Sequence, residues 1–181
     1  NKIDMFAFFP AQSFGMALTT FVGQNIGAGK MHRVKEGLRA TMLMSVLCGI
    51  GAMVLVLTCG PNMMHLFSQE AAVVEAGMDY LRPVMYCYLL FAIMNTVLSV
   101  LRGAGDMVFP MITSLLSLWI IRLPMAYLFS YWFGKEYIFF SYGGGWLIGM
   151  TMAIIYYFTG RWKKKAVVSK QSEEGLQEKY E

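Results

Sequence analysis

The chain has 181 residues, of which 57% are hydrophobic and 14% are charged, whereas an average soluble domain has about 45–50% and about 25%. The charged residues are concentrated in short segments between long apolar runs, a banding that is typical of a multi-span membrane protein. The formal net charge of +4 does not indicate a nucleic-acid partner, because the basic residues flank the apolar runs and form no basic face of a soluble domain.

The sequence offers no pattern for a metal site or an enzyme active site. Cys48, Cys59 and Cys87 lie in or at the end of apolar runs, without a CxxC or Cys/His spacing, and His32 and His65 stand alone. The chain also lacks a P-loop, a paired His/Glu motif and a Ser/His/Asp set. We therefore expect no catalytic residues, no bound metal and no cofactor.

The first predicted membrane span covers residues 5–25, and it is about as long as the ~20 residues that a bilayer requires. Gln12, Thr19, Thr20 and Gln24 give this span a partly polar side. Such a side suits packing within a helix bundle or contact with a cavity better than contact with lipid alone.

The segment 21–39, FVGQNIGAGKMHRVKEGLR, is predicted to be the cytoplasmic end of the first span. Gly27 and Gly29 can both adopt the left-handed conformation that ends a helix. The basic residues that follow lie beside the negative end of the helix dipole. The segment 101–106, LRGAGD, repeats this glycine turn after a later apolar run.

The second predicted span covers residues 40–59 and carries Ser45, Gly49 and Ala52 on one side, where small residues permit close approach of another helix. The segment 60–62, Gly-Pro-Asn, is predicted to break this helix. Residues 63–82 are predicted to form a partly exposed helix on the outer side before the next crossing.

The third predicted span covers residues 83–101. Polar and small residues share one of its helical faces at spacings of three and four: Tyr88, Ala92, Asn95, Ser99 and Arg102. Two interpretations stay open for this face. It is either a helix-packing seam, with Asn95 bonded to a neighbouring helix, or the wall of a solute path.

The fourth predicted span, residues 107–133, contains Arg122 and Pro124. Arg122 lies near the middle of the span, where a charge costs about 2.5–3.5 kcal/mol unless it has a partner or a wet cavity. Pro124 frees the carbonyl of Ile120 and is expected to kink the helix. We expect Arg122 to face the interior, near this freed backbone or near Asn95.

Residues 134–145 are predicted to form an outer loop with interfacial aromatic residues. The fifth predicted span runs from about 144 to 160, and Gly145, Gly149 and Ala153 give it a small-residue packing face. Basic residues at 161–165 follow at once and are expected to anchor this end near anionic lipid in the cytoplasm. Residues 166–181 are too polar to fold alone and are predicted to be a disordered cytoplasmic tail.

Residues 1–165 therefore read as one all-α, polytopic membrane unit. Basic clusters follow the first, third and fifth spans, whereas the other connections are poor in Lys and Arg. Five crossings then place the start of the chain outside and its C-terminus in the cytoplasm. We expect a multi-pass protein of the plasma (inner) membrane, with membrane lipid as a partner.

The two glycine segments and the run LRGAGDMVFPMITSLLSLWIIRLPMAYL resemble the C-terminal lobe of the MATE family, the multidrug and toxic compound extrusion transporters. The residues that match the family pattern are Gln24, Asn25, Gly27, Ala28, Gly29, Arg33, Arg102, Gly103, Gly105 and Pro124. The resemblance implies a twelve-helix transporter with two six-helix lobes, of which this chain supplies the last five helices. It also implies an N-terminal lobe of the same full-length chain as a partner.

The resemblance further implies export of cationic or amphipathic organic compounds in exchange for protons or sodium. The alternatives are a related exporter of lipid-linked saccharide and a non-transporting membrane scaffold. As the wall of the substrate path we consider a polar set: Gln12, Tyr88, Asn95, Ser99 and Arg122.

Antiport requires a group that binds and releases the driving ion, and a carboxylate inside the membrane is the usual one. The five predicted spans contain no Asp or Glu, and Asp106 lies at a span end. Some branches of the family carry an acidic residue in the helix that ends in Leu-Arg-Gly, and this sequence departs from them. We therefore expect the site for H⁺ or Na⁺ to lie outside this chain, in the first helix of the other lobe.

Overall fold

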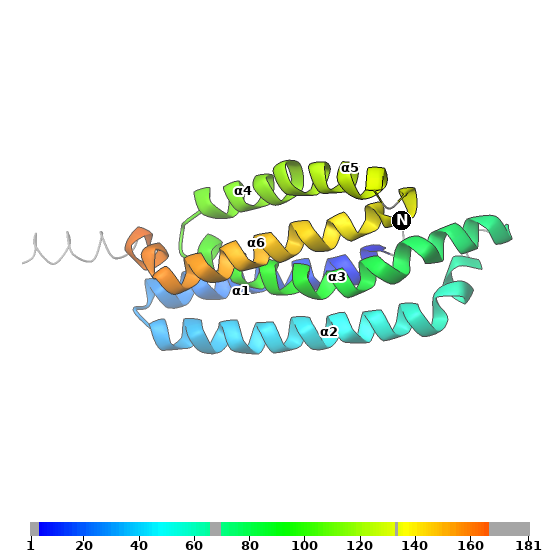
Figure 1. The fold of residues 1–181 in the computed structure, drawn as a ribbon. Helices are drawn as coiled ribbons and strands as arrows, with labels where there is room; N and C mark the ends of the chain where they lie inside the picture. Colours follow the sequence, from blue (N-terminus) through cyan, green and yellow to red (C-terminus); the bar gives the residue numbers. More distant parts are fainter. Residues whose placement is uncertain (1–3, 66–69, 133, 167–181) are drawn as a thin grey trace, which may run out of the picture.

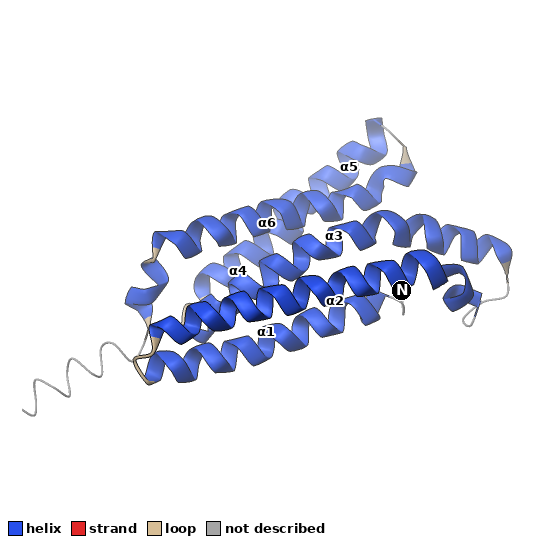
Figure 2. Ribbon diagram, turned by 90° about the horizontal axis from the view of Figure 1, so that it is seen from below, coloured by secondary structure: helices blue, strands red, loops and turns tan. Residues whose placement is uncertain are grey.

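The computed structural model describes residues 4–65, 70–132 and 134–166, and all regular secondary structure in these ranges is helical (Figure 2). The elements in chain order are α1 (Asp4–Gly27), α2 (Met31–His65), α3 (Ala71–Gly103), α4 (Val108–Leu115), the π-helix η1 (Leu116–Arg122), α5 (Leu123–Trp132), the 3₁₀ helix η2 (Lys135–Phe139), α6 (Phe140–Thr159) and the 3₁₀ helix η3 (Arg161–Lys165). The predicted tail falls almost entirely outside the described residues.

The long helices lie side by side and alternate in direction (Figure 1). The α1–α2 turn, the α3–α4 turn and η3 gather at one end of the bundle, on the left in Figure 1, and the end of α2, the start of α3 and η2 lie toward the other. α3 is the central helix, because it packs against α1, α2 and α6. α4, η1 and α5 follow one another without a break and pack mainly on α6.

Burial follows from these positions. Every side chain from 94 to 101 of α3 is buried, as expected for a helix with neighbours on all sides. α2 instead exposes large apolar side chains such as Leu43, Leu47 and Val54 along its outer face. An exposed apolar helix face of this length suits lipid rather than water.

Four described helical stretches are long and apolar enough to cross a membrane: Met31–His65, Ala71–Gly103, Val108–Trp132 and Tyr137–Thr159. The predicted polytopic helical membrane architecture is therefore confirmed. α1 is not one of these four, although its 24 residues would reach about 36 Å and it lies alongside them. Its crossing of the membrane and the boundaries of all five spans stay predictions.

The helix break predicted at 60–62 is wrong, because α2 continues through Pro61 for about another turn. A proline inside a helix loses one hydrogen bond and crowds the preceding turn. Packing offsets this cost, since Val56, Gly60 and Met64 are buried at four-residue spacing on one face. A Cβ on Gly60 would lie 2.8 Å from the Sδ of Met78 in α3, so the missing side chain permits this contact.

The outer loop predicted at 134–145 is also largely helical, because η2 and then α6 begin within it. Three consecutive glycines do not end the helix, since each allows close packing on a neighbour. A Cβ on Gly143 would lie 2.8 Å from the Sγ of Cys87, and a Cβ on Gly145 would lie 3.0 Å from the carbonyl oxygen of Ser117. The helix therefore begins earlier than the glycine content of the segment suggested.

The two glycine turns have the same backbone structure. Gly29 and Gly105 have φ angles of 69° and 86°. In each turn the glycine N–H donates to the carbonyl three residues back, and the following N–H donates to the carbonyl five residues back, at 2.8–3.0 Å. This is the Schellman pattern, which satisfies carbonyls that the end of a helix leaves free.

The prediction that Gly27 is also left-handed is wrong, because its φ is not positive and it is the last residue of α1. Its counterpart Gly103 has a different role: a Cβ there would lie 2.5 Å from the carbonyl oxygen of Thr19. Gly103 therefore permits close approach of α1 and α3, while the neighbouring Gly105 makes the turn.

Substitution of Gly29 by Ala should lower the free energy of unfolding by about 1–2 kcal/mol, because a side chain disfavours the left-handed conformation. Gly27→Ala is the matched control two residues away. It should leave stability unchanged or raise it by up to about 1 kcal/mol, since alanine favours the helix and nothing lies within 4 Å of its Cβ. Thermal unfolding in detergent micelles measures both, and equal losses would contradict the assignment.

Candidate functional site

Asn95 is the centre of a polar seam between α1 and α3. It is 3% exposed, and its Nδ2 donates a hydrogen bond of 2.9 Å to the carbonyl oxygen of Ala11 in α1. Its Oδ1 accepts a bond of 3.3 Å from the guanidinium of Arg102, two turns further along α3. Both ends of the amide are therefore bonded within the protein.

Gly15 makes this seam possible, although it is not among the residues predicted from the sequence. A Cβ on Gly15 would lie 2.5 Å from the Nδ2 of Asn95 and 2.7 Å from the Oγ of Ser99. One turn later, the hydroxyl of Thr19 donates to the carbonyls of Gly15 at 2.9 Å and of Ser99 at 3.2 Å. The four-residue spacing of Ala11, Gly15 and Thr19, all small, is the signal that could have revealed it.

The residues predicted for the substrate path do not form one cluster. Asn95 and Ser99 are buried in the α1–α3 seam, as the packing interpretation expects. Tyr88 is buried on α3, where its ring lies 5.4 Å from that of Trp146 in α6. Gln12 is half-buried on α1, and Arg122 lies at the end of the π-helix η1. Contact of these residues with a substrate stays a prediction.

Arg122 pairs with an aromatic ring. It is half-buried at the end of η1, and the centre of its guanidinium lies 3.4 Å from the ring centroid of Tyr142 in α6. The cation therefore lies on the negative face of the ring. Of the two neighbours expected for Arg122, the freed backbone or Asn95, the second is wrong, because the Oδ1 of Asn95 accepts from Arg102 of α3 instead.

Two cavities adjoin this pair, with volumes of about 380 and 190 Å³, and Arg122 and Tyr142 line both. The larger one is otherwise mainly apolar, with Leu118, Trp119 and Phe139 among its walls. The Tyr142 ring thus stabilises the charge of Arg122 within the bundle, and the guanidinium still borders both cavities.

A π-helix, η1, ends two residues before Pro124, where the sequence predicts a kink. The kink itself stays a prediction. Proline has no N–H to donate to the preceding turn, so the regular hydrogen-bond ladder must change there. Ser117 fixes the π-helix to α6, because its hydroxyl donates a 2.6 Å bond to the carbonyl of Gly145.

The predicted small-residue face of α6 is confirmed. Gly145, Gly149 and Ala153 are buried together with Ser141. A Cβ on Gly149 would lie 2.6 Å from the Sδ of Met94 and 3.3 Å from the Oγ of Ser117, so a larger residue would require the Met94 side chain to move.

Asp106 forms a second polar cluster, at the α3–α4 turn. It is 1% exposed, and its carboxylate accepts hydrogen bonds from the hydroxyl of Tyr156 at 2.6 Å and from the Nζ of Lys165 at 3.2 Å. The N–H of Phe109 donates to it at 3.5 Å. Asp106 thus joins the second glycine turn to α6 and η3.

These bonds decide the ionisation of the carboxylate. Burial alone would raise the pKa of Asp106, but the bonds from Tyr156, Lys165 and Phe109 together with the charge of Lys165 bring its pKa below the ordinary value. Asp106 is therefore ionised at neutral pH and is paired with a cation.

The other residues of the predicted motif lie around the same end of the bundle. Asn25 is buried and its Nδ2 donates to the carbonyl of Phe21 at 2.8 Å, whereas Gln24, Ala28 and Arg33 are exposed. Within the described residues, no group of three or more His, Cys, Asp or Glu side chains could hold a metal ion.

Comparison with known proteins decides the family. The MatE family profile matches residues 1–128. The chain belongs to the MatE family. Among MatE relatives, it is 30% identical over 163 residues to the probable multidrug resistance protein YpnP of Bacillus subtilis, covering 90% of this chain and 37% of that protein.

Two further relatives are more distant. The probable multidrug resistance protein NorM of Thermotoga maritima is 25% identical over 178 residues, 94% of this chain and 37% of that protein. Multidrug and toxin extrusion protein 1 of Homo sapiens is 22% identical over 125 residues, 69% and 22% of the two chains. The chain thus spans 37% or less of these MatE relatives, and no solved structure matches it.

Replacing Tyr142 by Leu should lower the free energy of unfolding by about 1–2 kcal/mol, because Arg122 loses the ring that lies beneath it. Tyr142→Phe keeps the ring face and should change stability by less than about 0.5 kcal/mol. Thermal unfolding of the purified variants compares them, and a Phe variant as unstable as the Leu variant would contradict the cation–π contact.

The Asp106 cluster predicts acid sensitivity. Because the pKa of Asp106 is lower in the folded state, its stabilisation is fully present above the unfolded-state pKa and is lost as the pH falls through the folded-state value. Asp106→Asn should lower the free energy of unfolding at pH 7 by about 1.5–3 kcal/mol and flatten the loss of stability below about pH 4.

The matched control is Asp79→Asn, which removes the same charge from an exposed position on α3. Unfolding temperatures measured between pH 3 and pH 7 test this prediction. An unchanged pH profile in the Asp106 variant would show that the carboxylate does not act as described.

Proposed function

We propose that the protein containing this chain is a secondary active antiporter that exports cationic or amphipathic organic compounds in exchange for protons or sodium. Membership of the MatE family is the observation that carries the proposal. The names of the Bacillus, Thermotoga and human relatives, which refer to multidrug resistance or extrusion, support export of varied compounds.

The surface of α1 suits such a role. Phe9 and Met16 are 60% and 72% exposed on this helix, and Met107 and Met111 at the start of α4 are 59% and 56% exposed. Methionine is flexible and polarisable, so it adapts to ligands of different shape. These residues are the proposed source of a mainly apolar wall for the exported compound.

The coupling ion is proposed to bind outside this chain. The predicted spans contain no Asp or Glu, and Asp106, the buried carboxylate at the α3–α4 turn, already has Lys165 as a partner. A group that is held ionised by a cation is poorly suited to exchange a proton near neutral pH. The proposed site is an acidic residue of the N-terminal lobe, which is the proposed partner of this unit.

The charge distribution supports an orientation. Lys30, Arg33, Lys35 and Arg39 lie at the end of the bundle that also holds η3, whereas Glu75 and Asp79 lie toward the other end (Figure 1). The positive-inside rule therefore favours placing the glycine turns and the C-terminus in the cytoplasm. The proposed location is the plasma (inner) membrane.

Expression of the full-length protein in an efflux-deficient bacterial strain tests the proposal. Cells that express it should accumulate several-fold less ethidium than cells with an empty vector. Dissipation of the proton or sodium gradient should remove the difference, because export then lacks its driving force.

Equal accumulation in both strains, with the protein present in the membrane, would contradict drug export. If the rest of the full-length protein contains no carboxylate within the membrane, the proposed location of the coupling site is contradicted.

A further inference from the structure

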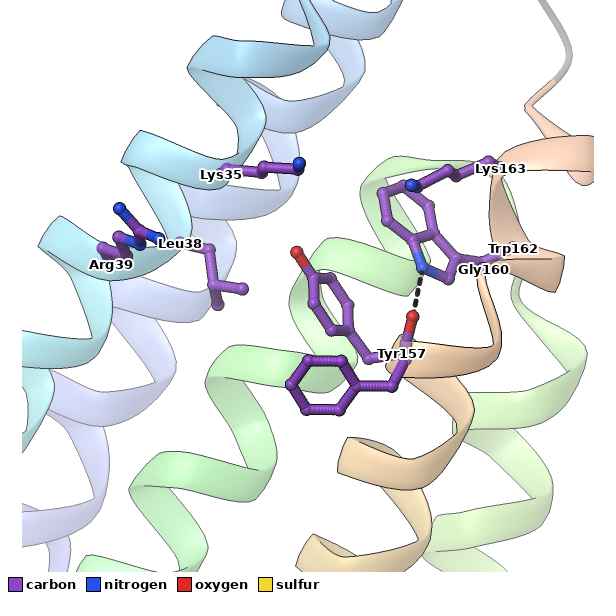
Figure 3. Close-up of a pocket in the computed structure, with 8 residues that line it drawn as sticks. Lys35, Leu38, Arg39, Tyr157, Gly160, Trp162 and Lys163 are labelled. Carbon is purple, nitrogen blue, oxygen red and sulfur yellow. Dashed lines mark hydrogen bonds between the residues drawn. The ribbon is translucent and has the colours of Figure 1, made fainter.

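A basic groove lies at the end of the bundle that holds the glycine turns (Figure 3). We define the basic groove by six of its lining residues: Lys35, Arg39, Tyr157, Phe158, Trp162 and Lys163. Its volume is about 410 Å³, and none of the described residues that line it is acidic. It lies between the start of α2 and the segment in which α6 passes into η3.

The floor of the basic groove is rigid. Trp162 is 1% exposed, its Nε1–H donates a 2.9 Å hydrogen bond to the carbonyl of Tyr157, and the two rings stack with centroids 5.5 Å apart. Gly160, with a φ of 68°, ends α6 and turns the chain so that Trp162 folds back (Figure 3). These contacts within the protein hold Trp162 in place as the floor of the groove.

Three cations surround the basic groove. Among the described residues, no carboxylate lies within 4.0 Å of any of the three. Lys35 and Arg39 approach from α2 and Lys163 from η3, where its Nζ lies 5.7 Å from the Trp162 ring centroid (Figure 3). An adjoining cavity of about 400 Å³ shares these three cations and adds His32 and Glu36. Positive charge therefore predominates throughout, and an anion bound there would relieve the repulsion.

Apolar surface extends from the basic groove along both helices. Phe158 is 79% exposed, and Ile155, one turn earlier on α6, is 61% exposed. On α2, Leu43 follows Arg39 by one turn and is 61% exposed. A small soluble anion would use only the cations, whereas a lipid would use the cations and the apolar surface together.

We propose that the basic groove binds the phosphate of an anionic phospholipid, with the acyl chains lying along Leu43, Ile155 and Phe158. The phosphate accepts hydrogen bonds from Lys35, Arg39 and Lys163, and the aromatic floor holds the glycerol region at the depth of the membrane interface. The bound lipid links α2 to η3, two segments that approach each other at this groove.

Native mass spectrometry of the full-length protein in detergent, titrated with phosphatidylglycerol or phosphatidylcholine, tests this site. Phosphatidylglycerol should be retained preferentially. Lys163→Gln should weaken its retention about fivefold, the effect of one basic residue near a lipid surface. The matched control, Lys164→Gln, removes the same charge from the next exposed residue, which does not line the groove, and should change retention less than twofold.

A second pair of variants tests the α2 side of the groove. Lys35→Gln with Arg39→Gln should weaken retention more than tenfold, whereas Lys30→Gln with Arg33→Gln, which removes two exposed charges outside the groove, should change it little. Unchanged gel-filtration profiles and unfolding temperatures would show that the variants are folded. Equal losses in groove and control variants would overturn the proposal, because they would indicate only general surface charge.

A third arm distinguishes the lipid from a free phosphate. Phe158→Ala keeps every charge and should weaken retention of phosphatidylglycerol, since it removes apolar surface beside the groove. Millimolar inorganic phosphate should not displace the lipid. Complete displacement by inorganic phosphate, an unchanged affinity in the Phe158 variant, or no preference for phosphatidylglycerol would each overturn the proposal.

Discussion

The hydrogen bonds of Asn95 are the interaction on which the packing of this unit depends. An amide left without partners in an apolar environment costs about 2–7 kcal/mol, and lipid cannot supply the missing bonds. The contact with the carbonyl of Ala11 therefore fixes α1 against α3 at one register. Because α3 also packs against α2 and α6, a shift at this seam would disturb those two interfaces as well.

Glycine at the points of closest approach follows from the same constraint. Interhelical hydrogen bonds in membranes contribute only about 0.6–2 kcal/mol each, so close backbone packing must supply much of the remaining attraction. Gly15 admits the Asn95 amide, Gly103 admits the backbone of α1, and Gly149 admits Met94. Close packing stabilises the helix interfaces at these glycines, and interhelical hydrogen bonds stabilise them at neighbouring positions.

Much of this organisation could be predicted from local pattern. The helical class, the Schellman turns at Gly29 and Gly105 and the small-residue face of α6 depend on residues close together in sequence, so spacing alone reveals them. The continuation of α2 through Pro61 could not be predicted in this way. It depends on how Gly60 meets Met78, a contact between helices that local propensity does not contain.

The partners of the charged residues were the least predictable part of the candidate site. Depth in the membrane indicates that Arg122 needs a partner, but its identity depends on how α6 is rotated about its own axis. That rotation brings Tyr142 to the guanidinium, and the Gly145 and Gly149 contacts with Ser117 set it. Likewise, sequence places Asp106 in a turn but cannot show that Lys165, far along the chain, folds back onto it.

The π-helix has a consequence for the helical phase of everything that follows it. A π-helical segment accommodates one residue more than an α-helix over the same hydrogen-bonded turn, so η1 sets the angular position of α5 relative to α4. Loss of one residue within Leu116–Arg122 would therefore convert the wide turn into a regular α-helical turn and leave the later side chains at nearly the same angles about the helix axis. Loss of one residue from the regular helix α5 would instead rotate the side chains beyond the deletion by about 100°. Two single deletions in this span thus have opposite consequences, depending on which side of Leu123 they fall.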